Sequence, residues 1–127
     1  MRGRGSSGSS GARGGGSSAS QIKNSSGAPE RAVEFLREGM EKVQTYGIGK
    51  VIINNSSEES LMGTKNAPSV VDKKFEKQLS DLAMENGYGV SFNTVSSKST
   101  RRQDLKYGSN TYVNKRKDRV ANFYKLP

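Results

Sequence analysis

The C-terminal part of the chain combines many cations with aromatic side chains. Residues 88–127 contain nine bases and two acids, a net charge of +7. The bases are Lys98, Arg101, Arg102, Lys106, Lys115, Arg116, Lys117, Arg119 and Lys125, and the aromatic residues among them include Tyr107, Tyr112, Phe123 and Tyr124. Cations neutralise phosphates, and aromatic rings stack on unpaired bases. This composition therefore favours contact with a nucleic acid.

We expect the basic segment 98–119 to bind phosphates and either Tyr107 or Tyr112 to stack on bases. Only 31% of the chain is hydrophobic, so such a domain cannot leave all of its aromatic rings exposed. At least two of Tyr112, Phe123 and Tyr124 are therefore expected in the core.

The N-terminal segment adds further candidate cations. Gly and Ser fill 17 of the first 27 positions, so this stretch buries too little surface to offset the entropy of ordering it. We interpret residues 1–19 as a disordered tail resembling the Arg-Gly segments of RNA-binding proteins. Residues 5–11 equally resemble an expression linker. The further candidates for nucleic-acid binding are Arg2, Arg4, Arg13 and, outside the tail, Lys65.

The chain lacks the residue types of the commonest catalytic sites. It has no His and no Cys, which excludes a Cys/His zinc site, a thiol nucleophile and a histidine base. Asp72 and Glu76 are one helical turn apart and could hold Mg²⁺ in a nuclease. Lys73, Lys74 and Lys77 lie beside them, so surface ion pairing explains the pattern better. We expect neither an enzyme nor a bound metal or cofactor.

The overall charge points to a polyanionic partner. The formal net charge is +9 and the isoelectric point is near 9.9, an excess that phosphates would balance. A membrane span would need roughly 18 consecutive apolar residues, and the chain has no such run. We expect a soluble intracellular protein, located in the cytoplasm or nucleus if the source is eukaryotic.

Hydrophobic periodicity predicts two helices and several strands. Apolar residues three and four positions apart predict helices over residues 29–46 and 69–86. The β-branched run 50–54 and the alternating run 88–94 predict strands. Residues 20–24 could form a short first strand.

The C-terminal region has two interpretations. Residues 111–114 and 119–126 are either two strands around a turn at 115–118 or parts of one long strand. Ahead of them, the basic segment 96–110 is expected to be a mobile loop.

Three local motifs resemble those of a known family. Ile22–Gly27 followed by Arg31-Ala32-Val33, then Tyr46–Ile53, and finally Leu61–Ala67 are similar to segments of the Alba family, in the same order. The resemblance implies the element order β-α-β-α-β-β, a mixed sheet with two helices, and DNA or RNA binding. It also implies a homodimer or heterodimer.

The chain departs from the Alba pattern at two places. Residues 55–60, with Glu58 and Glu59, intervene where the family turns at once into its second helix. The family's basic residues before the first helix are absent, since Ser25, Ser26 and Gly27 stand there. These departures affect the family's duplex-binding surface more than its fold.

The sequence thus predicts a small two-layer α+β domain over residues 20–127 that binds nucleic acid, RNA rather than DNA. No basic recognition helix is evident, and a tail with exposed aromatic residues suits single-stranded or structured RNA. The alternative is a structural or interaction protein, such as a phage or ribonucleoprotein-particle component. Its basic end would dock on an acidic partner.

Overall fold

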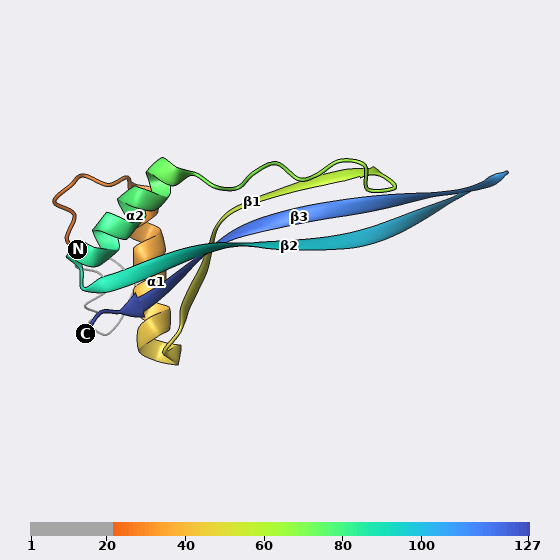
Figure 1. Ribbon diagram of the computed structural model, residues 1–127. Helices are drawn as coiled ribbons and strands as arrows, with labels where there is room; N and C mark the ends of the chain where they lie inside the picture. Colours follow the sequence, from red (N-terminus) through yellow and green to blue (C-terminus); the bar gives the residue numbers. More distant parts are fainter. Residues whose placement is uncertain (1–21) are drawn as a thin grey trace.

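The computed structural model describes residues 22–127, and they form two helices and three strands. The elements are α1 (Glu30–Tyr46), β1 (Gly49–Leu61), α2 (Lys73–Glu85), β2 (Tyr88–Leu105) and β3 (Gly108–Lys125). The strand order is β1-β3-β2, and both pairings are antiparallel. The helices lie at one end of the sheet, and β2 and β3 continue beyond them as a long hairpin (Figure 1). The predicted α+β class with two helices is confirmed.

Helix α1 follows from its apolar spacing and its two ends. Pro29 directly precedes it with φ −64°, a value that suits helix entry. Its buried residues Ala32, Leu36 and Met40 are four positions apart, and Gly39 lies on the same side. Gly47 ends the helix at φ 78°, and its N–H donates to Val43 O at 2.8 Å. The predicted range 29–46 is therefore almost unchanged in the structure.

Helix α2 begins later than the sequence predicts. We expected residue 69 as its start, but Asp72 is the N-cap, and its carboxylate accepts the Phe75 N–H at 3.2 Å. The Glu76 carboxylate in turn accepts the Asp72 N–H at 3.2 Å. Ser69 instead accepts a hydrogen bond from the Val71 N–H within the preceding loop.

None of the helices within residues 22–127 is long and apolar enough to cross a membrane.

The core lies between the two helices and one face of the sheet. Leu36 of α1 and Leu79 of α2 are fully buried and pack with Val51 and Phe123 of the sheet in one cluster. Gly39 permits the close approach of α1, because a Cβ there would lie 2.6 Å from Cγ of Phe123. The core therefore needs a glycine at this helical position.

We predicted that at least two of the three C-terminal aromatic residues are in the core, but only one of them is. Phe123 is buried, Tyr112 is partly exposed and Tyr124 is half exposed. Alternation along β3 explains the difference. Phe123 points to the helices, whereas even-numbered residues point to the other face of the sheet.

The predicted mobile segment 96–110 is a regular hairpin. Pairing between β2 and β3 continues from Tyr88↔Lys125 to Leu105↔Gly108, with a turn at residues 106–107. Gly108 has φ 143°, a conformation that glycine adopts readily. Of the two interpretations of the C-terminal region, the single long strand is therefore correct.

The predicted first strand and the mixed sheet were wrong. Residues 22–24 are not in a strand, and residues 20 and 21 lie outside the described part, as does the predicted tail, 1–19. Asn24 instead forms a turn by exchanging hydrogen bonds with the Ala28 backbone, at 2.8 and 2.9 Å. Lys23 N–H donates to Asn86 Oδ1 at 2.8 Å, which fixes the segment to the end of α2. Without a parallel partner for β1, all strand pairings of residues 22–127 are antiparallel.

A carboxylate also holds this N-terminal segment. The hydroxyl and the N–H of Ser25 donate to Glu85, and both hydrogen bonds lower the pKa of that carboxyl group. A lowered pKa in the folded state stabilises the fold above the unfolded-state pKa. This contribution is lost as the pH falls through the lower folded value.

Replacing Gly39 tests the close approach of α1 to the sheet. We expect Gly39→Ala to lower the free energy of unfolding by about 1–3 kcal/mol, because the added methyl group overlaps the ring of Phe123. Helix propensity alone would change it by about 1 kcal/mol in the opposite direction. Urea denaturation measures the difference. Glu41→Ala, on the exposed side of α1, is the control and should stay within about 0.5 kcal/mol. An unchanged value for Gly39→Ala would contradict the contact.

Candidate nucleic-acid interface

The hairpin formed by β2 and β3 projects from the domain and carries most of the predicted site. We call residues 95–118 the arm. It extends away from the helices (Figure 1), and β1 runs along it as a third strand as far as the pair Leu61↔Tyr112. Residues 55–60, which depart from the Alba pattern, are this extension of β1. The predicted basic segment is therefore held in a fixed register.

The register divides the predicted cations between two faces of the arm. Directly paired residues in antiparallel strands point to the same face. Lys98 pairs with Lys115, and Ser96 pairs with Lys117, so these four residues share one face. Arg101 pairs with Tyr112 on the opposite face, which also carries Arg116. We name the first set the lysine face.

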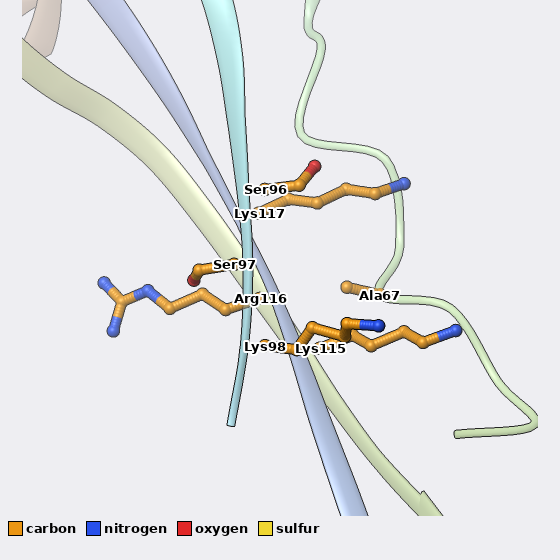
Figure 2. Close-up of a pocket in the computed structure, with 7 residues that line it drawn as sticks. All are labelled: Ala67, Ser96, Ser97, Lys98, Lys115, Arg116 and Lys117. Carbon is orange, nitrogen blue, oxygen red and sulfur yellow. The ribbon is translucent and has the colours of Figure 1, made fainter. Parts of the chain in front are cut away.

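The lysine face borders a pocket of about 300 Å³. The lining residues are Ala67, Ser96, Ser97, Lys98, Lys115, Arg116 and Lys117. In Figure 2, Lys115 and Lys117 extend toward the strand-to-helix segment that carries Ala67, while Arg116 points the other way. The pocket therefore gathers three ammonium groups from two strands.

The three lysines of this pocket have no carboxylate partner within residues 22–127. Among the salt bridges of residues 22–127, none involves Lys98, Lys115 or Lys117. Lys115 Nζ donates to Asn66 Oδ1 at 2.9 Å, a neutral acceptor. Glu58 is the cross-strand neighbour of Lys115 on β1, yet it does not reach salt-bridge distance. The positive charge of the cluster is thus available to a ligand.

The segment between β1 and α2 forms the wall of the pocket. Ser56 Oγ donates to Pro68 O at 2.6 Å, and Asn54 Nδ2 donates to Val70 O at 3.1 Å, which ties the segment to β1. Lys65 lies in this segment, exposed, and its N–H donates to Ser60 Oγ at 3.0 Å. Asn66, which follows Lys65 in the chain, is the acceptor of Lys115.

The arginines of the arm, by contrast, are paired with acids. Arg101 contacts Glu59 at 3.0 Å, Arg102 contacts Asp104 at 3.0 Å, and Arg116 contacts Asp118 at 2.9 Å. The hydrogen bond from Arg101 to Glu59 raises the pKa of the guanidinium further. Exposed pairs of this kind are worth about 0–1 kcal/mol, so phosphates can displace the carboxylates. The pairs nevertheless reduce the net charge of this part of the surface.

The two aromatic candidates differ in accessibility. Arg101 lies over the ring of Tyr112, 4.5 Å from its centroid, so one ring face is already occupied. Tyr107 is at the tip of the arm and is 91% exposed. Lys106 Nζ lies 5.4 Å from the Tyr107 ring centroid. Tyr107 is therefore the more accessible stacking surface of the two.

Arg119 is part of the domain interior rather than of the phosphate-binding surface that we expected. Its guanidinium donates to both carboxylate oxygens of Glu76, at 2.9 and 3.1 Å, and to Thr94 Oγ1 at 3.0 Å. The side chains of Arg119 and Glu76 are only 16% and 9% exposed. Because Glu76 lies 43 positions away, sequence spacing does not reveal this pair.

The carboxylates considered for a nuclease have separate structural roles. Asp72 caps α2, and Glu76 binds Arg119. No group of three or more metal-ligating side chains occurs within residues 22–127. The three arginines predicted from the tail, Arg2, Arg4 and Arg13, lie outside the described residues.

Sequence reasoning missed the polar residues that complete the pocket. Ser96 and Ser97 line it from β2, and Ala67 lines it from the covering segment, in which Asn66 accepts a hydrogen bond from Lys115. Alternation along a continuous β2 would have placed Ser96 beside Lys98. That signal was lost because 96–110 was interpreted as a loop.

Removing Arg119 tests its structural role. We expect Arg119→Ala to lower the free energy of unfolding by about 3 kcal/mol, because the buried Glu76 carboxylate would keep no cationic partner. Denaturant unfolding followed by circular dichroism gives the value. Arg116→Ala removes an exposed arginine of the arm as a control and should cost less than about 1 kcal/mol. Equal, small losses for both variants would return Arg119 to the phosphate-binding candidates.

Comparisons with protein-family models, curated proteins and solved structures find no match to this chain. The resemblance to the Alba family stays a prediction from the sequence motifs.

Proposed function

We propose that this protein binds nucleic acid through its arm, with single-stranded or structured RNA preferred over duplex DNA. The observation that carries the proposal is the cluster of Lys98, Lys115 and Lys117, three cations without carboxylate partners at one pocket. Bringing three ammonium groups together is unfavourable unless an anion neutralises them. A chain of phosphates is the anion that best matches a row of cations along a strand.

The spacing of the cluster supports an extended ligand. Alternate residues on a strand are about 7 Å apart, and directly paired residues are about 5 Å apart. Lys115 and Lys117 thus offer two cations along β3, and Lys98 offers a third from β2. Successive phosphates of one nucleic-acid strand can contact them in turn.

The preference for RNA is supported by the exposed tip. Tyr107 offers a stacking surface for an unpaired base, which a regular duplex does not provide. The lysines of α2 are interspersed with acids, and Lys77 pairs with Asp81 at 3.0 Å, so this helix is a poor reader of a DNA groove.

The proposal is tested by removing the cluster and measuring fluorescence anisotropy of labelled single-stranded RNA, duplex RNA and duplex DNA over a salt series. We expect the wild type to prefer single-stranded RNA and its affinity to fall steeply with salt. In the triple variant Lys98→Ala, Lys115→Ala, Lys117→Ala, the slope of log K against log salt should decrease by about 2, because three phosphate contacts to a single strand are lost.

A matched control keeps the total charge change equal. The variant Lys73→Ala, Lys74→Ala, Lys77→Ala also removes three cations, but from α2, and should leave most of the affinity and the slope intact. Equal losses in both variants would mean that net charge alone drives binding. If no nucleic acid binds even at low salt, the proposed function fails and an acidic protein partner becomes the better explanation.

A further inference from the structure

The face of the sheet opposite the helices carries exposed residues that have no role in the nucleic-acid binding proposed for the arm. Beside the core, the cross-strand rows on this face are Tyr124 with Gly89, then Lys50 with Asn122 and Ser91, then Ile52 with Val120 and Asn93. The helices pack against the other face, where Ala121 and Phe123 join the core. Tyr124 and Ile52 are about half exposed, at 50% and 48%.

Tyr124 is held by contact with a glycine. A Cβ on Gly89 would overlap Cζ, Cε2 and the hydroxyl oxygen of Tyr124, so the outer part of the ring lies directly over the backbone of Gly89. A glycine inside a strand weakens the strand, and an aromatic ring from the neighbouring strand that covers it compensates for this loss. The remaining exposure of Tyr124 leaves ring surface accessible to a planar ligand.

Two amide side chains in the next two rows of this face retain hydrogen-bonding capacity. Asn122 Nδ2 donates to Asn93 Oδ1 at 2.7 Å and to Ser91 O at 3.4 Å. With this assignment of the amide atoms, Asn122 Oδ1 and Asn93 Nδ2 have no partner among the described residues. One acceptor and one donor are therefore available in the two rows that follow the row of Tyr124. An aromatic surface with such groups on the same face is the combination that recognises the edge of a nucleobase.

The charge of this face suits the same ligand. Lys50 is the cross-strand partner of Asn122 on this face, whereas Lys125 pairs with the core residue Tyr88 on the face of the helices. The three rows contain no acid, and the nearest on β3 is Asp118, which is paired with Arg116. A phosphate attached to a stacked nucleoside would therefore find one cation, Lys50, and no competing carboxylate in these rows.

We propose that Tyr124, Asn122, Asn93 and Lys50 form a second nucleic-acid contact in which an unpaired nucleobase stacks on Tyr124. We call this set the tyrosine platform. It deepens the proposed function and rests on it, since the arm supplies phosphate contacts and the platform supplies a base contact on the body of the domain. The ligand it selects is single-stranded, because only an unpaired base exposes its ring face.

The first test replaces the ring and follows binding of single-stranded RNA by anisotropy. Tyr124→Ala should weaken binding by about 5- to 100-fold, the range expected for one stacked base. The slope against salt should stay unchanged, because no phosphate contact is lost. Tyr124→Phe keeps the ring and should bind within about twofold of the wild type. Tyr46→Ala removes a tyrosine that is 76% exposed at the end of α1 and should have no effect.

A second measurement uses the wild-type chain, so it does not depend on the stability of a variant. Single-stranded RNA containing 5-iodouridine is photocrosslinked to the protein, and the adducts are located by mass spectrometry. A crosslink at Tyr124 is expected. Crosslinks confined to the arm, together with an unaffected Tyr124→Ala variant, would overturn the tyrosine platform and leave the proposed function standing. Absence of binding by the wild type would overturn both.

Discussion

Backbone pairing of β3 on both of its sides is the constraint on which the rest of the structure depends. Within the domain this strand also contributes Ala121 and Phe123 to the core, but along the arm few apolar side chains are buried. The arm is therefore ordered by ladder hydrogen bonds and cross-strand contacts. Because side chains alternate strictly along a strand, the same register that builds the arm separates the lysine face from Arg101, Arg116 and Tyr112.

The sequence predicts the part of the fold that has a hydrophobic period. Helix α1 was placed within one residue, and α2 was placed within four, since their apolar stripes repeat every three or four positions. The arm has no such period, because Ser, Thr, Lys and Arg occupy both of its faces. In the arm, strands were interpreted as a loop, whereas at residues 20–24 an irregular segment was interpreted as a strand. A short segment with one large apolar residue was assigned to a strand, whereas Asn86 and Glu85 hold residues 23–25 at the end of α2.

The sequence predicts which cations the candidate site contains, but it does not predict which of them form ion pairs. The sequence shows where the cations are concentrated. Only the structure shows that Arg119 is bound to Glu76 and that Lys98, Lys115 and Lys117 form no salt bridge within the described part of the chain. These differences depend on contacts between residues far apart in the chain. The position of Tyr124 likewise depends on Gly89, which pairs with it from the neighbouring strand.

The outer edge of β2 has a consequence for how these molecules behave at high concentration. A long edge strand offers unpaired N–H and C=O groups to any other strand, and proteins discourage such association with charged side chains, lysine above all. Lys98, Arg101 and Arg102 occupy this edge strand of the arm. Lys98, one of the three cations proposed to bind phosphates, therefore also discourages edge-to-edge pairing of two arms. Neutralising these charges would remove this repulsion and would favour contact between the edges of neighbouring arms.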